Sequence, residues 1–213
     1  MEIEVWSDVV CPWCYIGKRR LEQALAAQGL SDHDSPVRVI HRAFQLDPQA
    51  MSEGQRTIDV LASKYQVSPQ QAEAMMANVT EVAEGVGLTY HLLQTISGNT
   101  KDAHRLLLWA QDQGHAQDLL EALYASYFTD GLPIFTETEL MAFVVKAGLE
   151  ATDAQVLLAS DAYAAEVQAD QELAADFGAT GVPFFVFDRR YGISGAQPLE
   201  VFRETLAKAM EES

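Results

Sequence analysis

The feature that most constrains this chain is a pair of cysteines at the point where a strand pattern gives way to a helix pattern. Cys11 and Cys14 are its only cysteines. Residues 3–6 alternate and are rich in β-forming side chains, which predicts a first strand that ends near residues 7–8. Pro12 then suits the first turn of a helix, where its missing N–H costs nothing. A disulfide across so short a loop removes little entropy from the unfolded chain, so the pair suits chemistry better than cross-linking.

The junction between strand and helix predicts different roles for the two thiols. The free N–H groups of the first helical turn and the positive end of the helix dipole stabilise a thiolate on Cys11, and thiolate is the nucleophile of disulfide exchange. Cys14 lies one turn further along, where it can attack the mixed disulfide and release the product. Pro12 stiffens the turn, and Trp13 offers an aromatic face to a substrate. We therefore predict Cys11 as the attacking thiol and Cys14 as the resolving thiol.

The cysteine pair has two other interpretations. A zinc site needs two further Cys or His ligands at suitable spacing. The sequence has no second CxxC and no pair of histidines at the spacing of a zinc finger, so no metal is expected. The other interpretation is a pair of incidental buried cysteines, which chance rarely places at a strand–helix junction.

The remaining pattern predicts a strand–helix–strand unit, a long helical segment and a strand–strand–helix unit. The first helix should end at Gly29, and a second strand over residues 37–41 should run parallel to the first. After residues 184–187, an apolar run typical of a buried strand, come a turn at 188–190, a strand at 191–194 and a last helix. That helix should begin at residues 197–198 and bury Phe202, Leu206 and Met210 on one side.

The segment from about Asp47 to Phe177 has helical periodicity, with glycines at the expected helix ends. Two apolar stripes in it are expected to face a core: residues 75, 76, 79, 82, 83 and 86, and residues 119, 120, 123, 124, 127 and 128. The predicted fold class is therefore α/β, with a mixed βαβ…ββα sheet and a large all-helical insertion. The expected division is a sheet domain over 1–47 and 178–213, and a helical domain over 48–177.

A proline directly before the third strand is the second candidate site feature. Pro183 can precede a central strand only at its start or at an irregularity. A cis Val182–Pro183 bond would satisfy this and would leave the Val182 backbone free to pair with an extended peptide. An ordinary trans proline at a strand start is the alternative.

Charge and hydropathy exclude several classes of partner. The formal net charge is -17, whereas nucleic acids and anionic lipid surfaces need a basic face. The first residues lack the basic and apolar regions of a signal peptide, and no apolar run approaches the roughly 20 residues that span a bilayer. We therefore expect a cytoplasmic protein with no nucleic-acid or membrane partner.

Several motifs together resemble the DsbA-type branch of the thioredoxin superfamily, and within it the FrnE-like group. They are Ser7-Asp8-x-x-Cys11-Pro12-Trp13-Cys14-Tyr15-Ile16-Gly17, residues 41–48 (HRAFQLDP), residues 99–106 (NTKDAHRL) and Gly181-Val182-Pro183-Phe184. The resemblance covers essentially the whole chain. It implies a thioredoxin-like fold, a cis bond at Pro183, dithiol–disulfide exchange on peptide or protein substrates, and a helix near residues 99–105 beside the active site. Asn99, Val182 and Pro183 become candidate substrate-binding residues, and His104 a candidate supporting residue.

The sequence departs from the family pattern in two places. Many thioredoxin-fold enzymes carry a buried acid six residues before the first cysteine, where this chain has Val5. Asp8 is nearer and offers a proton acceptor, although an exposed aspartate that caps the helix is the alternative. The dipeptide between the cysteines is Pro-Trp, unlike the Pro-His of strongly oxidising periplasmic relatives, so their extreme potential is not expected here.

The leading prediction is a disulfide reductase or isomerase of the cytoplasm, because that compartment is reducing. Its partners would be protein or peptide thiols and disulfides, with no resident cofactor and with glutathione or another low-molecular-weight thiol as a co-substrate. A second prediction is a glutathione-dependent isomerase or transferase of the 2-hydroxychromene-2-carboxylate isomerase or kappa type, although that group has a serine at the first-cysteine position. A third is a chaperone-like binding module switched by the cysteines. A homodimer is left open.

Overall fold

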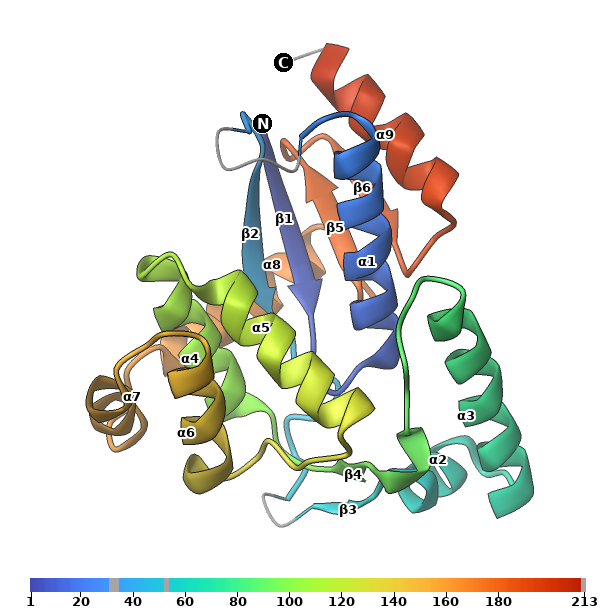
Figure 1. Ribbon diagram of the computed structural model, residues 1–213, viewed down its shortest axis with the longest axis vertical. Coiled ribbons are helices and arrows are strands. Elements are labelled where there is room, and N and C mark those ends of the chain that lie inside the picture. Colours follow the sequence, from blue (N-terminus) through green and yellow to red (C-terminus); the bar gives the residue numbers. More distant parts are fainter. Residues whose placement is uncertain (31–34, 52–53, 212–213) are drawn as a thin grey trace.

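A four-stranded mixed sheet forms the centre of the upper part of the molecule in Figure 1. This computed structural model describes residues 1–30, 35–51 and 54–211. The strand order is β2-β1-β5-β6, where β1 pairs in parallel with β2, and antiparallel pairs join β1 to β5 and β5 to β6. The strands are β1 (Glu2–Ser7), β2 (Arg38–Ala43), β5 (Phe184–Phe187) and β6 (Tyr191–Ser194). These pairings confirm the predicted fold class and the parallel first unit.

Helices α1 (Pro12–Ala27) and α9 (Leu199–Glu211) cover one face of the sheet, as Figure 1 shows. Side chains alternate between the two faces of a strand, so Phe185 and Phe187 of β5 point to this side. Phe185 packs edge-on against Phe202 of α9, with ring centroids 4.9 Å apart. Met210, which was expected on the buried side of α9, is 40% exposed, because the adjacent Ala209, 1% exposed, takes the inward position.

Helix α8 (Ala164–Asp176) packs against the opposite face of the sheet. Trp6, fully buried, lies on this face with Phe184 and Ala174. The indole Nε1 of Trp6 donates a hydrogen bond of 2.7 Å to the carbonyl oxygen of Asp170, which fixes α8 on the sheet.

Between β2 and β5 the chain is mainly helical, as predicted. Positive φ angles at Gly87, Gly114 and Gly148 fit the helix ends that the sequence indicated. Besides α8, the helices of this segment are α2 (Thr57–Tyr65), α3 (Pro69–Glu84), η1 (Leu92–Gln94), α4 (Lys101–Asp112), α5 (Ala116–Tyr124), η2 (Ala125–Thr129), α6 (Glu137–Lys146) and α7 (Ala151–Leu158).

A two-stranded ribbon in this segment was not predicted. Strands β3 (Gln55–Arg56) and β4 (Ile96–Ser97) pair antiparallel. Each has two residues, which is too short for an alternating pattern to show in the sequence.

The helical segment and the first turns of α1 share one apolar cluster. Tyr15 of α1 stacks on Tyr124 of α5, with ring centroids 4.8 Å apart. The stripe over residues 119–128 is buried as expected, whereas Met75 of α3 is 37% exposed because Met76 takes the inward position. The division into domains at residues 47–48 and 177–178 stays a prediction.

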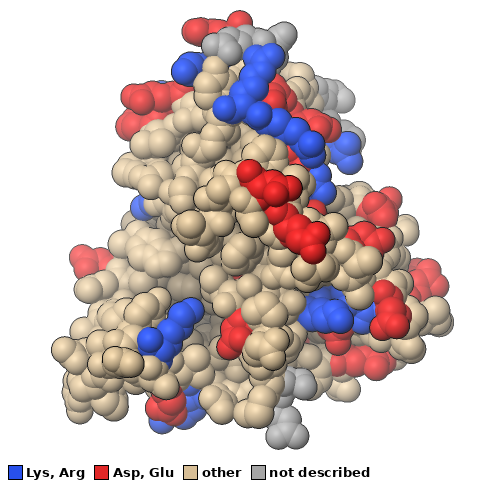
Figure 2. All heavy atoms as spheres, turned by 180° about the vertical axis from the view of Figure 1, so that it is seen from behind, with Lys and Arg blue, Asp and Glu red and all other residues tan. Residues whose placement is uncertain are grey.

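Charged side chains are unevenly distributed on the face in Figure 2. Lys and Arg gather mainly at its upper end, the end that carries α9 in Figure 1, while Asp and Glu are frequent along its right-hand edge. Within the described ranges, no helix has both the length and the apolar character needed to cross a bilayer.

Candidate active site

The two cysteines lie at the N-terminus of α1, one short turn after the carboxyl end of β1. Cys11 is the residue that precedes the helix, with φ -89° and ψ 111°, and Pro12 takes the first helical position. The N–H of Cys11 donates to the carbonyl oxygen of Asp8 at 3.1 Å, which closes the turn between strand and helix. Both cysteines are free thiols with 4% and 2% of their surface exposed. The structure therefore places the cysteine pair at a strand–helix junction, as predicted.

The loop before β5 brings Val182 and Pro183 to Cys11. Strands β1 and β5 are neighbours, so the end of β1 and the start of β5 lie side by side. The thiol of Cys11 donates to the carbonyl oxygen of Val182 at 3.6 Å, and the Val182–Pro183 bond is cis. Residues 171 positions apart thus form one site.

Gly17 lets α1 approach this loop closely. A Cβ atom built on Gly17 would lie 3.0 Å from both the Pro183 Cγ and the Phe185 Cζ atoms. Few real Cβ contacts are that short, so a larger residue at this position would separate α1 from the Pro183 loop. Gly17 therefore keeps the cysteines and the loop together.

Burial disfavours the thiolate of Cys14. Burial, together with the hydrogen bond and charge of Cys11, raises the pKa of the Cys14 thiol well above its usual value. Cys14 therefore rests as a neutral thiol. A thiol is a poor nucleophile, which agrees with the prediction that exchange with a substrate begins at Cys11.

Tyr90, in the segment after α3, holds the turn between the cysteines. Its hydroxyl donates a 2.8 Å hydrogen bond to the carbonyl oxygen of Pro12. Burial, then the charge of Cys11, raises the pKa of Tyr90, so the hydroxyl stays a donor. Trp13, in the same turn, is 38% exposed and is available to a substrate.

Asp8 and His104 form a buried pair beside the cysteines. His104 Nε2 lies 3.2 Å from Asp8 Oδ1, and the two side chains are 0% and 1% exposed. Asp8 Oδ2 accepts a 2.7 Å hydrogen bond from the backbone N–H of Leu46. The alternative of an exposed, helix-capping Asp8 is wrong, because α1 has no side-chain cap and the carboxylate turns toward α4 instead.

His41 opens the motif over residues 41–48 but was not predicted as a site residue, and it lies next to the Asp8–His104 pair. Its ring stacks on that of His104 with centroids 5.9 Å apart and planes 9° apart. Its Nδ1 atom lies 3.4 Å from Ser7 Oγ. Burial, then the charges of His104 and Arg42, lowers the pKa of His41 to about 3, so this ring is neutral near pH 7. The signals for it were its place at the start of the motif over residues 41–48 and its place in the second strand, where an apolar residue would be expected.

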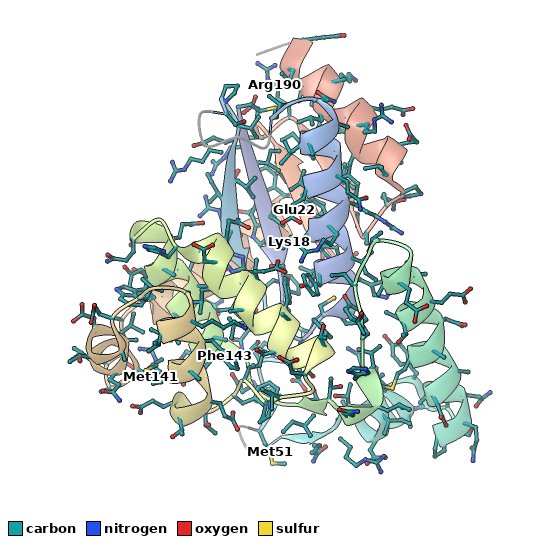
Figure 3. The ribbon with its side chains drawn as sticks, in the orientation of Figure 1. Lys18, Glu22, Met51, Met141, Phe143 and Arg190 are labelled. Atoms are coloured by element: carbon teal, nitrogen blue, oxygen red, sulfur yellow. The ribbon has the colours of Figure 1, made fainter. Side chains whose placement is uncertain are left out.

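A small cavity of about 50 Å³ lies behind Cys14, between α1, β1, β2 and α5. Ser7, His41 and Tyr124 line it together with Cys14, and Lys18 and Glu22 lie at its wall on α1. Figure 3 shows Lys18 and Glu22 side by side on that helix. The space suffices for one or two water molecules next to the Cys14 thiol.

An ion-pair group fastens α1 to α5 next to this cavity. Lys18 Nζ lies 2.8 Å from Glu121 Oε2, and Arg19 also pairs with Glu121. The Tyr15 hydroxyl donates to Glu121 Oε1 at 2.6 Å. Burial alone would raise the pKa of Glu121, but Arg19, Lys18 and Tyr15 outweigh it and lower the pKa to about 2.

Both polar atoms of the Asn99 side chain form hydrogen bonds within the chain. Its Nδ2 donates to the carbonyl oxygens of Pro48 and Ala50, both at 3.1 Å. Its Oδ1 accepts from Gln45 Nε2 at 3.1 Å and from the Lys101 N–H at 2.9 Å. The amide therefore orders residues 45–50 beside the site, and the predicted substrate-binding role of Asn99 stays a prediction.

Comparison with known proteins agrees with this arrangement. The family model of the DSBA-like thioredoxin domain matches residues 2–207. The chain belongs to this family. The expected DsbA-type resemblance and the assignment as a thiol–disulfide oxidoreductase are thereby confirmed.

Solved structures of this DSBA-like family and related folds are similar over the whole chain. A probable DsbA oxidoreductase from Streptomyces coelicolor is 45% identical, with a TM-score of 0.93 over 100% of this chain and 91% of that one. The cytosolic disulfide reductase DsbM from Pseudomonas aeruginosa is 16% identical, with a TM-score of 0.69 and 100% of both chains covered. A 2-hydroxychromene-2-carboxylate isomerase is 15% identical, with a TM-score of 0.72 over 100% and 97% of the two chains, which shows a common fold. The comparison with curated proteins found no match.

In this DSBA-like chain the site contains what dithiol chemistry requires. It has a thiol at a helix N-terminus, a second thiol one turn away and a backbone carbonyl facing the first. Within the described residues, no three His, Cys, Asp or Glu side chains are grouped so that they could hold a metal ion.

Proposed function

We propose that this protein exchanges disulfides of protein or peptide substrates through Cys11 and Cys14, in the reductase or isomerase direction. The observation that carries the proposal is the position of Cys11. This residue lies at the N-terminus of α1, and its Sγ atom is 3.6 Å from the carbonyl oxygen of Val182. An extended substrate that pairs with the Val182 backbone would place its disulfide next to that sulfur.

The reaction proceeds in two exchanges. The Cys11 thiolate attacks one sulfur of the substrate disulfide, forms a mixed disulfide and releases the other sulfur as a thiolate. Cys14 then gives up its proton and attacks the Cys11 sulfur, which releases the second substrate thiolate and forms the Cys11–Cys14 disulfide. Two electrons pass to the substrate. Two equivalents of a low-molecular-weight thiol, such as glutathione, would restore the dithiol and leave as their disulfide.

The reductase or isomerase direction is proposed for a cytoplasmic protein. The buried Cys14 thiol, with its raised pKa, and the absence of the Pro-His dipeptide support it. A structural neighbour, DsbM, is described as a cytosolic disulfide reductase and was also solved with glutathione, which illustrates such an activity on this fold.

Two variants test the proposal in an insulin-reduction assay. Cys11→Ser should abolish turnover, because no nucleophile remains. Cys14→Ser should keep the first exchange and accumulate mixed disulfides at Cys11, visible by non-reducing mass spectrometry. Wild-type turnover by Cys11→Ser would overturn the proposal.

The glutathione-dependent isomerase or transferase is the second candidate, and the likeness of fold to a 2-hydroxychromene-2-carboxylate isomerase favours it. Cys11 occupies the place where that group has serine. Isomerase or transferase turnover that survives Cys14→Ser, with one glutathione bound per chain, would support this candidate. The chaperone-like module predicts suppression of aggregation that does not change when both cysteines are replaced.

A further inference from the structure

An open groove of about 420 Å³ lies between α3 and residues 90–94. Met76, which is buried, contributes to its apolar lining, and Leu93, 51% exposed, stands at its edge. A hollow of this size holds several side chains of an extended peptide. The groove is therefore a candidate surface for a bound chain segment.

The groove adjoins the active site through one aromatic side chain. Tyr90 lines the groove, and its hydroxyl donates to the Pro12 carbonyl oxygen at 2.8 Å, between the two cysteines. A substrate whose disulfide meets Cys11 thus has residues a few positions away within reach of the groove.

Three glutamates of α3 give the groove its charge. Glu73, Glu81 and Glu84 line it and are exposed. Glu81 and Glu84 follow Glu73 by eight and eleven residues, which places all three on one side of the helix. None forms an ion pair with another described residue, and no Lys or Arg of the described chain lines the groove. The site therefore offers three unpaired carboxylates around a mainly apolar floor, to which Thr80, His91 and Gln94 add polar groups.

We propose that this groove binds a cationic, partly apolar peptide segment that flanks the reacting cysteine of the substrate. The inference rests on the proposed function, since it names the substrate class that Cys11 would meet. Lysine and arginine have the charge and the apolar stems that match a carboxylate rim over an apolar floor. Acidic segments would be repelled, and so would the anionic glutathione at this position.

The test uses two synthetic peptides, each with one cysteine in a mixed disulfide with a small chromogenic thiol. They share the same apolar residues and carry either three lysines or three glutamates beside the cysteine. The second-order rate constant of the reduced protein is measured with each in single turnover, and 2-hydroxyethyl disulfide reports the reactivity of Cys11 alone. The variant is Glu73→Gln/Glu81→Gln/Glu84→Gln. The matched control, Glu166→Gln/Glu204→Gln/Glu211→Gln, makes the same change in net charge at exposed positions on α8 and α9.

The wild type and the control should react about tenfold faster with the lysine peptide at low salt, and the preference should weaken at high salt. The groove variant should lose most of this preference and keep its rate with 2-hydroxyethyl disulfide. Equal rates of the wild type with both peptides would overturn the inference, and so would an equal loss of preference in the control. Failure of the proposed function looks different, because Cys11→Ser would then react with all three disulfides at the wild-type rate.

Discussion

The carboxylate of Asp8 meets the imidazole of His104 at 3.2 Å in a site that solvent does not reach. These residues are 96 positions apart, on the turn after β1 and on α4. The pair fixes the carboxylate within the electrostatic range of Cys14, whose pKa it helps to raise after the larger effects of burial and of Cys11.

Replacement of Asp8 by Asn should lower the pKa of Cys14. The variant removes a negative charge that opposes the thiolate and keeps a side chain of the same shape. In the reaction of Cys14 with a preformed mixed disulfide at Cys11, the pH profile should move to lower pH. Asp102→Asn on the exposed side of α4 is the control and should leave the profile in place. A profile of Asp8→Asn that matches the wild type would show that the carboxylate does not act on Cys14.

Gly17→Ala should weaken the contact between α1 and the Pro183 loop. The new Cβ would lie 3.0 Å from Pro183 Cγ and from Phe185 Cζ, so these side chains must shift. Overpacking of this kind costs about 1–3 kcal/mol in the free energy of unfolding. Chemical denaturation measures the loss, and turnover of insulin should fall with it. Unchanged stability together with unchanged turnover would mean that the loop adapts without moving away from Cys11.

Tyr90→Phe should loosen the turn between the cysteines without leaving a cavity. The variant loses only the hydroxyl that donates to the Pro12 carbonyl oxygen. The expected loss is about 1 kcal/mol in the free energy of unfolding, with slower reaction of Cys11 because its turn is less ordered. Tyr65→Phe, at a residue that is 52% exposed, is the control and should change neither quantity.

In Glu121→Gln the free energy of unfolding should fall less steeply as the pH is lowered. The pKa of Glu121 is about 2 in the folded protein and 4.5 in its reference state, so the folded state holds fewer protons between these values. Such a group stabilises the fold above pH 4.5, and its contribution disappears as the pH falls toward 2. The variant should therefore be less stable than the wild type near pH 7, and the difference should shrink through this range. A difference that is constant with pH would contradict the role of the ion pairs around Glu121.

Local patterns predicted much of the fold and the centre of the site. The alternation in β1, the proline after Cys11 and the glycines at helix ends each act within a few residues, so the sequence shows them directly. The burial of Asp8 and its pairing with His104 depend on how α4 packs against the end of β1, which no local pattern encodes. The same holds for His41 and for the groove beside α3. Met76 faces inward and its neighbour Met75 faces outward. Periodicity alone does not show which of two adjacent residues is buried.

The reduction potential of the Cys11/Cys14 couple tests the central claim most directly. Equilibration of the purified protein against glutathione buffers, with the thiol state read by alkylation and mass spectrometry, gives this value. A reductase or isomerase should show one two-electron transition at about -180 mV or below, in the range of thioredoxin, glutaredoxins and protein disulfide isomerase. A value near -120 mV, as in DsbA, would contradict the proposed direction of electron flow. The absence of any transition between dithiol and disulfide would contradict the assignment of the two cysteines as the active site.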